Sequence, residues 1–153
     1  MTVIRRNPAN RLAAQVRRPG GLSVADALQA AHDNLKSVQA ECLAAMDIAL
    51  ADIDAVVARC RREPAPADLD ALYTRANEVL EIAGVFGMQE LGDAAFSLCD
   101  LVDRFRTFER WNLPALEVHL QGLRALRAAA GIDDAATGAV LDGLRQVAAR
   151  AAR

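Results

Sequence analysis

Apolar residues recur at three- and four-residue intervals along most of the chain, which is the pattern of amphipathic helices. The longest run predicts a helix from Ser23 to about Arg62, because Asp26 follows Ser23 at the spacing of a capping box. Its apolar stripe consists of Leu28, Leu35, Cys42, Ala49 and Val56, with Val38, Met46, Ile53 and Cys60 beside it. No segment alternates with period two and alanine is abundant, so the chain is predicted to be all-α.

Four further helices are predicted from the same periodicity and from the residues that begin and end helices. Asp68 is expected to cap the first of them, and Gly87 to make the turn into a helix from about Met88 to Phe108. Asn112 with Pro114 opens the next, which Gly131 ends, and Asp133 or Asp134 caps the last. The expected core residues are Leu69, Leu72, Ala76, Val79, Ala83, Phe86, Leu91, Ala95, Leu98, Val102, Phe105, Leu116, Leu120, Leu123, Leu126, Val140, Leu144, Val147 and Ala151. Short connections favour an antiparallel four-helix bundle with an additional C-terminal helix, forming one domain over residues 23–153.

The first 22 residues differ in charge from the rest. They contain five arginines and no acid, and they end in Pro19-Gly20-Gly21, which predicts a break. The arginines are Arg5, Arg6, Arg11, Arg17 and Arg18. We interpret residues 1–22 as a basic, flexible arm; a short helix opened by Asn7 and Pro8, or contact with a partner, are the alternatives.

Charge and composition exclude several classes of function. The formal net charge of the 153 residues is −2, which provides no basic face for nucleic acid. No apolar run has the length of a signal peptide or a membrane span, so we expect a cytoplasmic protein without membrane insertion. Cys42, Cys60 and Cys99 lie far apart in helical patterns, which favours reduced thiols and no metal site. No cofactor motif is present, so none is expected.

The predicted second helix carries the candidate binding residues. At 100° per residue, Asn77 points away from the apolar stripe and is expected to face water. Tyr73, Leu80 and Gly84 lie on the same side, and a glycine on a helix surface lets another backbone approach. The predicted partner-binding residues are Tyr73, Asn77, Leu80, Glu81, Gly84 and Met88. The alternative is that these are ordinary surface positions on an alanine-rich helix.

The order of residues from Ala76 onward resembles that of the histidine-containing phosphotransfer (Hpt) domain of two-component signalling and chemotaxis. That family reads Ala-His-x-Leu-Lys-Gly-x-Ala-x-x-Phe-Gly, followed by Leu, Ala and Leu on the next helix. The positions in register are Ala76, Ala83, Phe86, Gly87, Leu91, Ala95 and Leu98. The resemblance implies a four-helix bundle whose partner is the receiver domain of a response regulator.

Three positions depart from the Hpt pattern. Asn77 replaces the phosphorylated histidine, Leu80 the lysine and Glu81 the glycine. An amide nitrogen is not a usable phosphate acceptor, whereas imidazole has a nucleophilic nitrogen. The region from Ala76 to Asp103 has no Lys or Arg and is expected to repel a phosphoryl group; its acids are Glu78, Glu81, Glu90, Asp93, Asp100 and Asp103. The resemblance therefore implies a receiver-binding module that accepts no phosphate; whether the protein is also an enzyme stays open.

Two other functions remain open at this point. Asn77, with Glu78 or Glu81 beside it, resembles the site of phosphatases that orient water toward the aspartyl phosphate of a response regulator. Alternatively, the long first helix or the basic arm makes the protein a structural adaptor, either a monomer or a homodimer. His32 lacks the flanking pattern of an acceptor and His119 flanks an apolar stripe, so both are interpreted as structural.

Overall fold

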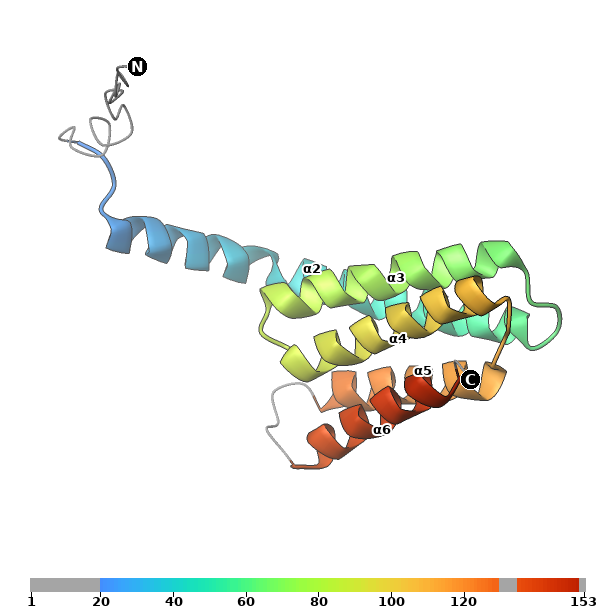
Figure 1. Ribbon diagram of the computed structural model, residues 1–153. Coiled ribbons are helices and arrows are strands. Elements are labelled where there is room, and N and C mark those ends of the chain that lie inside the picture. The colour runs from blue at the N-terminus through green and yellow to red at the C-terminus, as the bar shows by residue number, and fades with distance from the viewer. Residues whose placement is uncertain (1–19, 130–134, 152–153) are drawn as a thin grey trace, which may run out of the picture. The chain divides into compact units, whose positions relative to one another are not determined.

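The computed structural model describes residues 20–129 and 135–151 (Figure 1). Within these ranges the chain forms five helices and no strand, which confirms the all-α prediction. The helices are α2 (Val24–Cys60), α3 (Pro66–Val85), α4 (Gln89–Phe108), α5 (Leu113–Ala128) and α6 (Ala135–Ala151). No described helix combines the length and the apolar character needed to cross a membrane.

Contacts divide the chain into two units, residues 1–38 and 39–153, and the division falls inside α2. Most of the predicted basic arm lies outside the described residues. In the first unit, α2 begins as expected: Ser23 Oγ accepts the Asp26 N–H at 3.1 Å and donates to Asp26 Oδ2 at 2.7 Å. The described side chains of this unit are all exposed.

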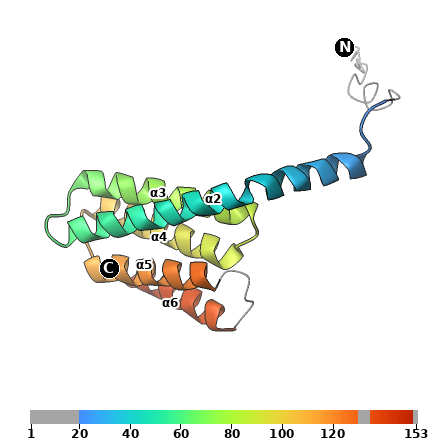
Figure 2. The ribbon, with the colours of Figure 1, turned by 180° about the vertical axis from the view of Figure 1, so that it is seen from behind.

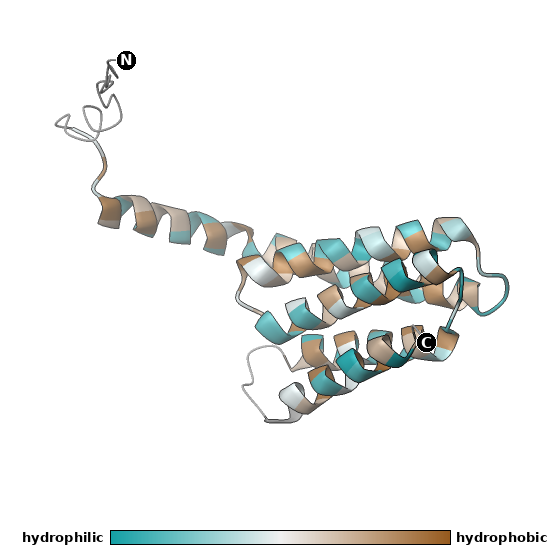
Figure 3. Ribbon diagram, viewed as in Figure 1, coloured by the Kyte–Doolittle hydropathy of each residue, from teal (hydrophilic) through white to brown (hydrophobic). Residues whose placement is uncertain are grey.

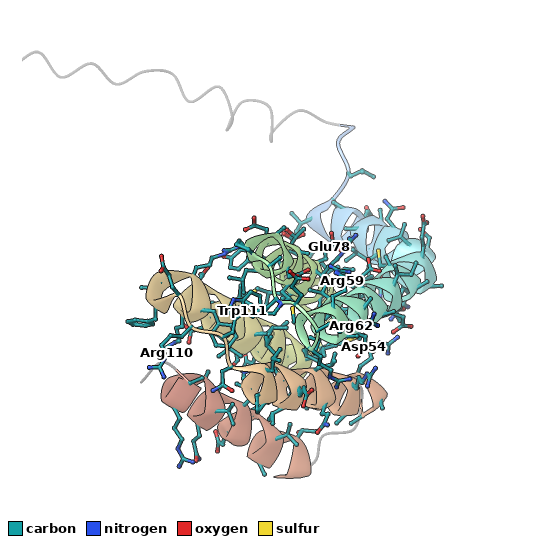
Figure 4. The ribbon with its side chains drawn as sticks, turned by 90° about the vertical axis from the view of Figure 1, so that its right-hand side faces the viewer. Asp54, Arg59, Arg62, Glu78, Arg110 and Trp111 are labelled. Carbon is teal, nitrogen blue, oxygen red and sulfur yellow. The ribbon has the colours of Figure 1, made fainter. Side chains whose placement is uncertain are left out.

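The second unit is a helical bundle. Helix α3 packs against α4, and α4, α5 and α6 pack against one another (Figures 1 and 2). We call residues 24–38 the first half of α2 and residues 39–60 its second half. Ion pairs place the second half beside two of these helices: Asp52 bonds Arg75 of α3 at 3.0 Å, and Asp54, labelled in Figure 4, pairs with Arg124 of α5. The second half of α2 therefore borders both α3 and α5.

The core is made by the second half of α2 together with α3, α4, α5 and α6. Its largest fully buried side chains are Met46, Ile53, Val57, Leu72, Val79, Leu91, Leu98, Leu101, Val102, Leu116, Leu123 and His119. The expectation that Leu28, Leu35 and Val38 belong to this core is wrong, because all three are exposed. Figure 3 shows apolar bands on this first half of α2. These residues do form one face of a helix, as predicted, but no described residue covers that face.

The helix ends follow the sequence with one correction. Asn112 caps α5 as predicted, because its side chain accepts the Ala115 N–H at 3.1 Å. Asp68 does not cap α3; it lies in the first turn, where its carboxylate accepts the Ala65 N–H at 3.1 Å and bonds Arg59 at 2.9 Å. Proline at the first helical position starts α3 two residues before Asp68. The predicted ends at Gly131, Asp133 and Asp134 lie outside the described residues.

Candidate functional site

The candidate site lies on the hairpin of α3 and α4. Gly87 closes the hairpin with φ of 70°, a left-handed conformation that glycine adopts without steric cost, and the Met88 N–H donates to Ala83 O at 2.9 Å. Small residues face each other where the two helices pack: a Cβ added at Gly92 would lie 3.7 Å from the Ala83 Cβ. Ala76 and Ala95 are also fully buried. Narrow side chains therefore let the two helices approach closely.

Asn77 is half-buried rather than directed fully into water. Its Oδ1 lies 3.8 Å from Cys99 Sγ on α4. Burial, reinforced by the charge of Asp103, raises the pKa of the Cys99 thiol to about 11, so the thiol stays protonated at neutral pH and can donate to Oδ1. The side-chain oxygen and nitrogen of Asn77 are bonded to the same carbon and point in different directions. Because the oxygen contacts Cys99, the nitrogen points away from Cys99.

Two other members of the predicted strip also contact α4. The Arg106 guanidinium lies 4.9 Å from the centre of the Tyr73 ring, and a Leu80 methyl would lie 3.7 Å from a Cβ at Gly92. Both side chains are half-buried against the core, so the expectation that Tyr73 and Leu80 form an exposed strip is wrong. The cause is that side chains of α4 cover this side of α3, which buries a wider arc than the apolar stripe alone predicts.

The surface that α3 leaves open is rotated from the predicted one. Asn77, Glu81, Gly84 and Val85 are spaced so that they share one face of α3, and we refer to them as the outer strip. Glu81, Gly84 and Val85 are exposed, and a Cβ added at Gly84 would meet nothing within 4 Å. Met88, just past the helix, is half-buried. Val85 was not among the predicted binding residues, because the apolar stripe continues through its neighbour Phe86. The helical spacing nevertheless places Val85 on the exposed face, beside Glu81.

Arginines neutralise much of the acidic character expected around the hairpin. Four of the six acids form ion pairs: Glu78 with Arg75, Asp93 with Arg145, Asp100 with Arg104, and Asp103 with Arg106. All four arginines lie outside the stretch from Ala76 to Asp103, so that stretch alone overstated the negative charge. Glu81 and Glu90 form no ion pair with any residue that the structure describes. The repulsion expected for a phosphoryl group is therefore concentrated at these two carboxylates.

The two glutamates considered beside Asn77 have different surroundings. Glu78, labelled in Figure 4, receives both of its hydrogen bonds from Arg75, at 2.7 and 2.8 Å, and Arg75 also bonds Asp52 of α2. Glu81 is exposed one helical turn beyond Asn77. Glu78 is therefore part of the ion-pair network between α3 and α2. Glu81 is the glutamate that lies on the outer strip with Asn77.

Neither histidine lies on the outer strip. His32 is exposed on the first half of α2. His119 of α5 is fully buried: its Nδ1 donates to Ala115 O at 2.8 Å, and its Nε2 accepts from Ser97 Oγ of α4 at 3.1 Å. Burial lowers the pKa of His119, so the imidazole is neutral at pH 7. The sequence identified His119 as a packing residue but gave no sign of its hydrogen bond to Ser97.

The chain was compared with models of known protein families, with curated proteins and with solved structures, and none matched. Among the described residues, no three His, Cys, Asp or Glu side chains are grouped so that they could hold a metal ion. The functional assignment therefore rests on the geometry of the α3–α4 hairpin and of the residues around its outer strip.

Proposed function

We propose that this protein is an Hpt-like module of two-component or chemotaxis signalling that binds a receiver domain through the outer strip without accepting phosphate. In this proposal α2, α3, α4 and α5 form the four-helix bundle, and α6 is the additional helix. The packing of α3 on α4 and of α4 on α5, with the ion pairs that join α2 to α3 and to α5, supports this arrangement. The setting would be the cytoplasm, where response regulators act.

One observation carries the proposal: residues shared with the Hpt pattern lie inside the hairpin or at its turn, whereas two positions that depart from it, 77 and 81, lie on the open side. Ala76, Ala83 and Ala95 are buried where α3 meets α4, and Gly87 makes the turn. The substituted position 77 lies on the open side, followed by Glu81 and Gly84. A partner that reaches position 77 would therefore contact the outer strip, where the absence of a side chain at Gly84 allows close approach.

The described histidines support a module that accepts no phosphate. His119 is enclosed and hydrogen-bonded through both ring nitrogens, so neither nitrogen can attack a phosphoryl group without opening the core. His32 is exposed but lies on α2, away from the hairpin in sequence, and its flanking residues lack the acceptor pattern. The Asn77 amide at the acceptor position has no nucleophilic nitrogen.

The test is to measure the affinity of the full chain for a panel of receiver domains from the same organism, together with two matched variants. Gly84→Gln adds a side chain on the outer strip, and Gly143→Gln adds the same side chain on α6, where a Cβ also meets nothing within 4 Å. We expect a receiver that binds the wild type to lose at least about tenfold in affinity for Gly84→Gln, about 1.4 kcal/mol, and to bind Gly143→Gln normally. Absence of binding to every receiver, or equal losses for both variants, would contradict the proposal.

A second candidate, a receiver phosphatase, is favoured by the contact between Asn77 and Cys99. With Oδ1 held by the thiol, the Asn77 nitrogen can position the attacking water, and Glu81 can accept its proton. The water oxygen would bond to phosphorus as the bond to the receiver aspartate breaks, which releases inorganic phosphate and a carboxylate. This candidate predicts that Asn77→Ala abolishes the accelerated loss of receiver phosphate but keeps binding. If the wild type accelerates no receiver, the phosphatase is excluded and the binding module is retained.

A further inference from the structure

The first half of α2 carries apolar residues that no described part of the chain covers. Val24, Leu28, Ala31, Leu35 and Val38 follow one another at steps of four, three, four and three residues, and all five are exposed. We call these five residues the exposed seam. Alternating steps of three and four are the repeat by which helices pair in coiled coils, with Leu28 and Leu35 at position a of the heptad and the other three at position d.

The residues beside the exposed seam favour a partner helix whose own flanks carry little charge. The flanking e and g positions are Ala25, Ala27, His32, Asn34, Gln39 and Glu41, of which only Glu41 has a formal charge at neutral pH. The charged side chains Asp26, Asp33 and Lys36 lie at outer positions, where Asp33 also accepts a hydrogen bond from Gln29 at 3.0 Å. A second copy of the same helix has the required uncharged flanks and brings no like charges together.

The order of residue sizes also fits a second copy, in the antiparallel direction. When two seams pair antiparallel with residue 33 of each at the centre, Leu28 of one copy lies opposite Val38 of the other, and Ala31 lies opposite Leu35. The twofold symmetry of the pair makes each of these two layers of facing side chains occur twice. Each layer then joins a larger and a smaller side chain, as close helix packing requires. A parallel pair would put Ala31 opposite Ala31 and leucines at position a with valines at d, a choice that disfavours two-stranded parallel coils.

We propose that the exposed seam binds the exposed seam of a second copy of this chain as an antiparallel helix pair. This interface does not depend on the outer strip of α3 or on a receiver partner, so it stands or fails separately from the proposed function. It gives the protein a dimeric state in which the first half of α2 is covered.

The first test is the mass of the full chain in solution, measured by sedimentation or light scattering from low to high micromolar concentration. We expect a shift from 16.4 kDa toward twice that mass. The double variant Leu28→Glu/Leu35→Glu should raise the dissociation constant at least about tenfold. The control Ile48→Glu changes an equally exposed residue of α2 outside the seam and should dimerise normally. A wild type that stays monomeric at every concentration overturns the proposal.

The second test determines the direction of the pair by disulfide formation, in a Cys42→Ser background. Leu28→Cys and Val38→Cys proteins are oxidised separately and as a mixture. The antiparallel pair places Cys at 28 opposite Cys at 38 and separates identical positions by about 15 Å, so only the mixture should form linked dimers. Cross-linking of Leu28→Cys alone would indicate parallel helices and overturn the proposal, as would the absence of any linked dimer. Circular dichroism of each variant confirms that the helices are retained.

Discussion

The two halves of α2 have the same helical periodicity and opposite surroundings. In the first half Leu28 is 66% exposed and Leu35 is 43% exposed, whereas in the second half Ile53 is 1% exposed. One continuous helix thus contains an uncovered apolar face and a face that forms the core of the second unit. The comparison shows that three- and four-residue spacing predicts a helix with an apolar face but leaves open what covers that face.

The width of the apolar stripe distinguishes the two halves. In the second half, Ala49 with Leu50 and Val56 with Val57 are adjacent buried residues, which widen the stripe enough to contact more than one helix. The first half has no two adjacent large apolar residues, so its seam has the narrow form of a coiled-coil interface. The width of the apolar stripe therefore distinguishes the two halves in the sequence, whereas the three- and four-residue spacing, which they share, does not.

The largest expected effect comes from shortening one side chain in each half. Ile53→Ala should lower the free energy of unfolding by about 2–5 kcal/mol, because it leaves a cavity in the core. Leu28→Ala should change it by less than about 0.5 kcal/mol when measured at concentrations where the chain is monomeric. Urea denaturation followed by circular dichroism measures both. A comparable loss for Leu28→Ala would show that the first half is buried in the monomer and would remove the contrast.

The next effect concerns a carboxylate in each unit. Desolvation raises the pKa of the Asp68 carboxyl, but hydrogen bonds from Arg59 and the Ala65 N–H outweigh it and hold the pKa below the usual 3.8. Asp68 therefore stabilises the fold above about pH 4, and this contribution is lost as the pH falls below its unfolded value. Asp68→Asn should cost about 1–3 kcal/mol at pH 7 and reduce the acid sensitivity of unfolding. Asp33→Asn in the exposed half should do neither.

A smaller, pH-dependent effect comes from His119. Its pKa is lowered by burial, so below its unfolded value of 6.5 the unfolded chain binds more protons and the fold loses stability. The loss should grow by at most about 1.4 kcal/mol per pH unit. Unfolding measured between pH 7.5 and about 5 should show this decline in the wild type and less of it in His119→Gln. His32→Gln, in the exposed half of α2, is the matched control, and an equal change in both variants would contradict the assignment.

The smallest effect is expected from an ion pair on the surface of the second half of α2. Asp47 pairs with Arg127 of α5 at 2.9 Å, but its side chain is exposed, so the pair should contribute only about 0.2–1 kcal/mol. A double-mutant cycle with Asp47→Asn and Arg127→Gln measures the coupling, which should shrink at high salt. A coupling energy above that range would mean that ion pairs, and not only core packing, make the second half of α2 contribute more to stability than the first.

The sequence predicted the helices and the inward face of the α3–α4 hairpin, because these depend on local spacing. Leu72, Ala76 and Val79 are buried as expected, and Ser23 and Asn112 act as caps. The sequence did not predict which face of α3 stays open, because that depends on having two neighbouring helices. The contact between Asn77 and Cys99 joins residues 22 positions apart, so no local pattern could have indicated it.

Trp111 makes the second unit directly observable by spectroscopy. It is the single tryptophan of the chain, half-buried after the end of α4, with its ring centre 6.2 Å from that of Phe105 (Figure 4). Its fluorescence reports on the surroundings of α4 and α5, whereas circular dichroism sums over every helix, including the exposed half of α2. Heating the protein while recording both signals therefore separates melting of the bundle from fraying of α2, without attaching any dye.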